Sequence, residues 1–206
     1  RAGDIFIANF PDPAQDYYLR HINMPRQMLP VQPGSSVSEI EVMVEYISVQ
    51  YDRMWFVPIR ASEWDYDSKV RSHFDQTLML ESEHKLPKLE LLSYVTDPTQ
   101  AQGYHSLHSS FAGGPDLVGV QITANGVPSI KELVSGDLLR VSLVWETKSL
   151  IPTDYTVFVH ALDAEGRPVA QHDGVPQDAV RPTSTWGIGE VVLDTHEFEL
   201  PRLLVD

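Results

Sequence analysis

The 206-residue sequence has room for two domains of about a hundred residues each, and its 42% hydrophobic and 21% charged residues are typical of a folded chain. It contains no cysteine, which excludes disulfides and thiolate chemistry, and no apolar run reaches the roughly 20 residues of a membrane-spanning helix. The formal charge of −14, without a Lys/Arg cluster, excludes the cationic face that nucleic acid or anionic lipid requires.

The first half of the chain, residues 1–96, alternates strand-like and helix-like segments. Asp12-Pro13 is an N-cap followed by proline at the first helical position, and Ser36 and Glu39 have the spacing of a capping box. Apolar residues recur at three- and four-residue steps from Val37 to Tyr51, as on an amphipathic helix. A third helix is expected near Tyr66–Leu78. The expected strands are Asp4–Phe10, Met24–Leu29, Met54–Ile59, Met79–His84 and Lys88–Val95, the last two as an edge pair.

This alternation predicts a mainly parallel sheet in a small Rossmann-like α/β domain at residues 1–96. The loop after the first strand has no glycine, so it lacks the phosphate-binding signature. Ligands of such sheets bind at the carboxyl ends of the strands. A hydrolase or nucleotide-sugar enzyme would have a deep pocket with convergent carboxylates there; otherwise these residues are helix caps and a solvated rim. The candidates are Asn9, Asp12, Arg60, Glu63, Trp64 and Asp65.

In the second half of the chain, apolar residues recur at every second position. Residues 97–116, rich in Gly, Ser and His, predict a linker and the loop that leads into a second domain at residues 117–206. Apolar residues alternate with polar ones in Val118–Ala124 and Leu139–Glu146, and Thr156–Leu162, Pro168–Asp173 and Val191–Leu200 add strands. Short strands with turn signals and no amphipathic helix predict an antiparallel β-sandwich of jelly-roll or immunoglobulin-like type, which makes the whole chain an α+β two-domain protein.

Sandwiches of this kind often bind sugars, because aromatic faces stack on sugar rings and planar polar groups bind hydroxyls. The candidate ligand-binding residues are Tyr155, His160, Asp173, Arg181 and Trp186. A free-standing carbohydrate-binding module requires Trp186 in an open cleft. The alternative is that Trp145 and Trp186 are core or lid residues.

Catalytic and metal chemistry find little support in the sequence. Asp194 and His196 share a strand face, on which His172-Asp173 is positioned to converge, but no HExxH or comparable zinc spacing is present. No GxSxG nucleophile elbow occurs either. We therefore expect no catalytic residue, no transition metal and no cofactor. A structural Ca²⁺ bound by loop carboxylates of the sandwich is the one ion that remains open.

Short segments spread over nearly the whole chain resemble the C-terminal extracytoplasmic region of bacterial membrane glycosyltransferases of the dolichyl-phosphate-mannose-protein mannosyltransferase type (glycosyltransferase family 39-like). The similarity rests on the order of the segments, since each is short. They are Gly3-Asp4, Tyr17-Tyr18, Asp52–Val57, Gly136-Asp137, Asp154–His160, Leu162–Arg167, Pro182–Trp186, and Gly189-Glu190 through Asp194 to Leu200-Pro201.

The resemblance implies that these residues belong to a larger protein. In that family the acidic catalytic residues lie among the membrane helices and the donor is a lipid-linked phosphosugar, so no catalytic residue carries over. The expected role is a non-catalytic accessory domain on the extracytoplasmic face of a bacterial membrane, tethered by membrane segments outside this sequence. Its expected partners are the membrane-embedded transferase core of the same chain and a glycan or polypeptide acceptor, and not nucleic acid.

Overall fold

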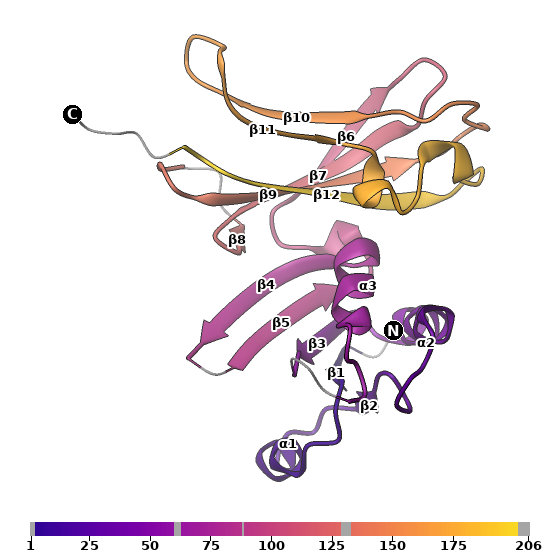
Figure 1. The fold of residues 1–206 in the computed structure, drawn as a ribbon, viewed down its shortest axis with the longest axis vertical. Coiled ribbons are helices and arrows are strands. Elements are labelled where there is room, and N and C mark those ends of the chain that lie inside the picture. Colours follow the sequence, from indigo (N-terminus) through magenta and orange to yellow (C-terminus); the bar gives the residue numbers. More distant parts are fainter. Residues whose placement is uncertain (1–2, 60–62, 88, 129–132, 202–206) are drawn as a thin grey trace. The chain divides into compact units, whose positions relative to one another are not determined.

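The computed structural model describes residues 3–59, 63–87, 89–128 and 133–201. The chain divides after Asp97 into two compact units, called here the N-terminal and C-terminal units. The N-terminal unit holds a mixed α/β sheet with helices, and the C-terminal unit holds antiparallel sheets (Figure 1). Neither unit closes its strands into a barrel within these ranges.

The N-terminal sheet has the strand order β2-β1-β3-β5-β4. β1 pairs in parallel with both β2 and β3, whereas β5 pairs antiparallel with β3 and β4. The sheet is therefore mixed and not mainly parallel as predicted. α3 leads from β3 to the edge strand β4, and the hairpin then inserts β5 antiparallel between β3 and β4. The strands are β1 (Asp4–Ala8), β2 (Arg26–Met28), β3 (Arg53–Val57), β4 (Met79–Leu86) and β5 (Leu89–Val95).

The first two helices begin where the sequence predicts, and the third begins three residues later than expected. Asp12 caps α1 (Pro13–Leu19) by accepting a hydrogen bond from the Ala14 amide, and Ser36 and Glu39 form the capping box of α2 (Val37–Gln50). α3 spans Lys69–Thr77. α2 and α3 pack on one face of the sheet, where Ile40, Val44, Ile47, Val70 and Phe74 meet Ile5, Ile7, Met54 and Phe56 in one apolar core. α1 contacts the other face, since Leu19 lies beside Phe6 and Trp55.

The C-terminal unit has a five-stranded sheet in which β12-β9-β7-β6 are neighbours and β8 also pairs with β7, together with a two-stranded hairpin, β10–β11. Its strands are β6 (Tyr104–Ser110), β7 (Asp116–Ala124), β8 (Val127–Pro128), β9 (Leu138–Glu146), β10 (Val157–Leu162), β11 (Pro168–Gly174) and β12 (Val191–Glu199). Short 3₁₀ turns η1 (Pro98–Gln100), η2 (Pro176–Ala179) and η3 (Thr183–Thr185) complete it. The predicted Asn125-Gly126 turn joins β7 to β8, with both residues at positive φ.

One segment differs from the sequence prediction. Residues 97–116 were expected to form a linker and loop, but β6 lies within them and pairs antiparallel with β7. β6 has only Tyr104 and Leu107 as large apolar residues, so it carries no hydrophobic alternation. Its backbone pairing and the Tyr104 ring, which lies over Gly119, hold it in place.

The hairpin β10–β11 covers the large C-terminal sheet through apolar side chains. Val157 and Val159 of β10 pack against a cluster that includes Val141, Leu143 and Trp145 of β9. Because side chains alternate along a strand, Phe158, His160 and Leu162 lie on the outer face of the hairpin. This face is called the outer hairpin face below.

Candidate functional site

An aromatic pocket of about 470 Å³ lies in the C-terminal unit. Four separate segments supply its aromatic residues. Phe111 precedes β7, Trp145 is the penultimate residue of β9, Tyr155 and Phe158 lie just before and within β10, and Trp186 follows η3. The other lining residues are Ala112, Gly114, Pro115, Thr156, Val157, Pro176 and Thr183. No ionisable group except the Tyr155 phenol is among these lining residues, so the pocket suits a neutral ligand with apolar faces.

Local sequence brings the Phe111 loop close to Tyr155. Phe111 and Trp145 pack edge to face with ring centroids 5.8 Å apart. Gly113 has a φ of +76°, which favours glycine, and a Cβ there would lie 3.4 Å from the Tyr155 hydroxyl oxygen. The glycines therefore let this loop turn tightly beside the phenol ring.

Hydrogen bonds fix the loop that carries Tyr155. The Tyr155 amide donates to Thr183 Oγ1 at 2.9 Å, and Thr183 Oγ1 donates to the Thr153 carbonyl at 3.0 Å. The Ser184 amide donates to Asp154 Oδ1 at 3.0 Å, and hydrogen bonds from Ser184 lower the pKa of Asp154. The wall formed by Tyr155 and Thr183 is thus preorganised by the protein itself.

Trp186 is buried, with 2% of its surface exposed, and its Nε1 donates to the Arg181 carbonyl at 3.0 Å. Its ring belongs to the apolar core and forms only an inner wall of the pocket. A free-standing carbohydrate-binding module requires an open Trp186 face, and this burial contradicts that requirement. The physical reason is the η3 turn, which folds the indole inward against the Arg181 carbonyl.

Trp145 has a polar atom without a partner. Its side chain is 6% exposed, and its Nε1–H has no hydrogen-bond acceptor among the described residues. Leaving a buried donor unpaired costs about 1–3 kcal/mol. This nitrogen has no exposed surface, so the unpaired donor is covered by neighbouring atoms although the Trp145 ring lines the pocket.

His160 and Asp173, two further sequence candidates, meet on the outer hairpin face. His160 Nε2 and Asp173 Oδ1 are 3.1 Å apart, and Gln171 Nε2 donates to Asp173 Oδ2 at 3.0 Å. Phe158, which lines the pocket, is 66% exposed and packs edge to face against the His160 ring. A row of hydrogen-bonding groups therefore lies directly beside an exposed aromatic ring at the pocket rim.

Arg181 is held in a structural role. Its Nη1 pairs with Glu190 Oε1 at 2.6 Å, and Glu190 Oε2 accepts from the Gly187 amide at 2.7 Å. Partial burial acts to raise the pKa of Glu190, but Arg181 and the Gly187 amide outweigh it and lower that pKa. Arg181 closes the loop around Trp186 and is not among the residues that line the pocket.

The predicted convergence of histidines on β12 is confirmed for His172. His172 Nδ1 lies 2.8 Å from His196 Nδ1, and His196 Nε2 lies 2.9 Å from Asp194 Oδ2. Asp173 lies on the opposite, outer hairpin face instead. Within the described ranges no cluster of three or more His, Asp or Glu side chains has the arrangement of a metal site.

The candidates at the carboxyl ends of the N-terminal strands form structural contacts. Asn9 accepts from the Ile59 amide and donates to the Ile59 carbonyl and to Asp65 Oδ2, so it joins the ends of β1 and β3. Asp65 Oδ1 accepts from the Val70 amide in the first turn of α3, and Asp12 caps α1. Glu63 is exposed and Trp64 half-buried, while Arg60 lies outside the described residues.

Sequence reasoning missed three members of the aromatic pocket as binding residues: Phe111, Trp145 and Phe158. The Gly113-Gly114-Pro115 signal after Phe111 marked a tight loop, and the alternation of β9 placed Trp145 on the inner face. Neither pattern indicates which loops meet at one end of the unit.

Comparison of the chain with known protein families, with curated proteins and with solved structures finds no match. Among the described residues, no helix combines the length and apolar character that crossing a membrane requires.

Proposed function

We propose that this chain is a non-catalytic accessory region that contacts a neutral glycan through its C-terminal unit. The observation that carries the proposal is the exposed Phe158 ring beside His160, Gln171 and Asp173, at the rim of the aromatic pocket. A sugar ring presents an apolar face to an aromatic ring and hydroxyls to neighbouring polar groups.

We also propose that the two antiparallel sheets of the C-terminal unit form a β-sandwich of jelly-roll or immunoglobulin-like type, and that the N-terminal sheet is a small Rossmann-like layer. The polar groups at its strand ends bind backbone, as the Asn9 bridge to Ile59 does, which supports a scaffolding role for the N-terminal unit.

The cellular location and the larger protein are proposed from the sequence resemblance. We propose that both units lie on the extracytoplasmic face of a bacterial membrane as part of a glycosyltransferase, where the chemistry belongs to a membrane-embedded core. The C-terminal unit then holds the acceptor, a glycan or a glycosylated polypeptide, near that core. This assignment rests on the resemblance and on the neutral, aromatic character of the pocket.

The test is calorimetric titration of the 206-residue protein with neutral oligosaccharides of mannose, glucose or galactose, with and without Ca²⁺. We expect Phe158→Ala to weaken binding at least about tenfold, which corresponds to about 1.4 kcal/mol. Leu162→Ala is the matched control, because Leu162 is also exposed on the outer hairpin face. Absence of binding across the panel, or equal losses in both variants, would refute the proposal.

A further inference from the structure

α2 carries apolar residues on two opposite sides. Ile40, Val44 and Ile47 are buried against the sheet. With 3.6 residues per turn, Val42, Tyr46 and Val49 lie on the side away from the core, and they are 64%, 63% and 69% exposed. A surface helix of a globular protein normally has a polar outer side, so this outer apolar stripe points to a partner.

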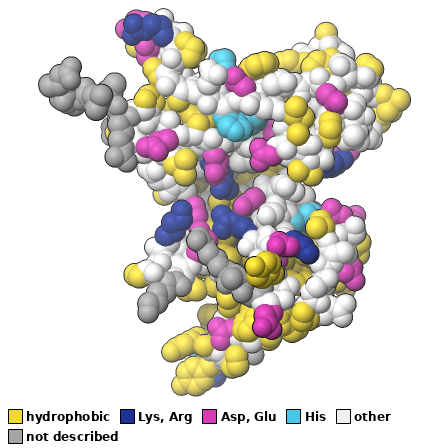
Figure 2. Space-filling view, in the orientation of Figure 1, with side chains coloured by type: hydrophobic (Ala, Val, Ile, Leu, Met, Phe, Trp, Pro, Cys, Tyr) yellow, Lys and Arg dark blue, Asp and Glu magenta, His cyan; other side chains and the backbone are white. Residues whose placement is uncertain are grey.

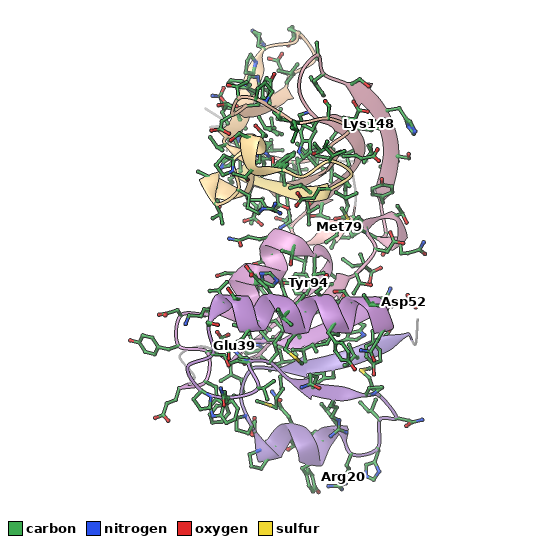
Figure 3. The ribbon with its side chains drawn as sticks, turned by 90° about the vertical axis from the view of Figure 1, so that its right-hand side faces the viewer. Arg20, Glu39, Asp52, Met79, Tyr94 and Lys148 are labelled. Carbon is green, nitrogen blue, oxygen red and sulfur yellow. The ribbon has the colours of Figure 1, made fainter. Side chains whose placement is uncertain are left out.

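A groove continues the outer apolar stripe. It measures about 590 Å³ and lies between α2 and the loop that follows β2. Leu29, Pro30 and Val31 form one wall, and Ile40, Val42 and Met43 form the other. Val42 belongs to both features, so groove and stripe are continuous along the helix. Four polar residues also line the groove: Gln32, Ser35, Ser38 and Glu39. In Figure 3 α2 lies toward the viewer between Glu39 and Asp52, and no other helix or strand of the N-terminal unit lies in front of it.

Negative charge lies within the groove and beside the stripe, because Glu39 also lines the groove. Glu39 and Glu45 flank the stripe on opposite sides of the helix, and Glu41 lies one position before Val42. All three glutamates are exposed, and no Lys or Arg occurs between Arg26 and Arg53. Hydrogen bonds from the Ser36 backbone and side chain lower the pKa of Glu39, which keeps that carboxylate charged. Acidic side chains are also spread over both units in Figure 2.

The negative charge of these glutamates indicates which kind of ligand fits the outer surface of α2. Anionic lipid would be repelled by Glu39, Glu41 and Glu45, so the apolar stripe is unsuited to a bilayer surface. An amphipathic helix with apolar residues at helical spacing and Lys or Arg on either side matches both the stripe and its acidic borders. We propose that this surface of α2 binds such a basic amphipathic helix of a partner protein, independently of any glycan site in the C-terminal unit.

The probe is a fluorescent basic peptide of about 18 residues, with leucines at i, i+3, i+4 and i+7 and lysines beside them. There are two control peptides. One has the same composition in scrambled order, and the other has glutamate in place of each lysine. Anisotropy titration of the 206-residue protein should give binding by the helical-pattern peptide at least about tenfold tighter than by either control. Added salt should weaken it, because exposed charges are screened.

Matched variants locate the site. Val42→Ser and Tyr46→Ser should each reduce the affinity at least about threefold, while Tyr18→Ser, at an exposed aromatic residue on α1, should leave it unchanged. Circular dichroism and thermal unfolding check that each variant is folded. Equal binding of the scrambled peptide, or unchanged binding by both α2 variants, overturns the proposal. A third outcome also overturns the proposal: the protein binds no peptide, and analytical sedimentation shows an oligomer that Val42→Ser dissociates. That result assigns the surface to a second copy of the chain.

Discussion

His172 and His196 share a hydrogen bond between their Nδ1 atoms, which are 2.8 Å apart. One Nδ1 must donate a proton and the other must accept it. Asp194 Oδ2 lies 2.9 Å from His196 Nε2, and an acceptor oxygen there favours the tautomer with a proton on Nε2. In that tautomer, His196 accepts at Nδ1 and His172 donates. Asp194 Oδ1 also accepts from the Gln177 amide, so this carboxylate orders the histidine pair and the η2 turn together.

Asp194→Asn should lower the free energy of unfolding by about 3 kcal/mol. The carboxylate is buried and accepts from two donors, and an amide nitrogen facing either donor leaves that donor unpaired. Asp173→Asn, on the outer hairpin face, should cost less than about 1 kcal/mol. Urea unfolding of both variants measures this, and equal losses would show that the Asp194 contacts are unimportant.

Stability should depend on His73 near neutral pH. Partial burial lowers the pKa of His73, although Glu41 opposes the shift. The folded protein then binds this proton less readily than the unfolded chain does, so the free energy of unfolding falls as the pH drops below about 6.5. His73→Gln should flatten this part of the stability profile. His84→Gln, at an exposed position on β4, is the control that removes a histidine elsewhere in the same unit.

Gly119→Ala should lower the free energy of unfolding by about 1–3 kcal/mol. A Cβ at residue 119 would lie 2.1 Å from the Tyr104 hydroxyl oxygen, so the ring that anchors β6 must move. In a Tyr104→Ser background the same substitution should cost less than about 0.5 kcal/mol, and a double-mutant cycle isolates this coupling. An undiminished cost in that background would mean that the strain arises elsewhere.

Asn9→Ala should lower the free energy of unfolding by about 2 kcal/mol, because it removes the hydrogen bonds that join the end of β1 to Ile59. Asn23→Ala changes an exposed asparagine of the same unit and should have little effect. Thermal and urea unfolding compare the two variants. A stable Asn9→Ala protein would indicate that this residue serves another purpose than holding the strand ends.

The local sequence of this protein determined its elements. Ser36 and Glu39 are three residues apart and cap α2 wherever that helix lies, and Asn125-Gly126 adopts the positive φ values that close the β7–β8 hairpin. The alternation of apolar and polar residues along β9 by itself predicts that Val141, Leu143 and Trp145 share one face of the strand. These features depend on residues close in the chain, so single-sequence patterns suffice to predict them.

Only the tertiary structure decided which distant segments meet. Phe111, Trp145, Tyr155 and Trp186 come from separate segments and form one pocket. The η3 turn buries Trp186, and the sequence around that residue does not indicate this burial. β6 lacks an apolar alternation and is held by backbone pairing with β7. His172 faces His196 only because β11 folds over β12. Hydrogen-bond direction and close packing depend on neighbours from other elements, and those neighbours exist only once the chain has folded.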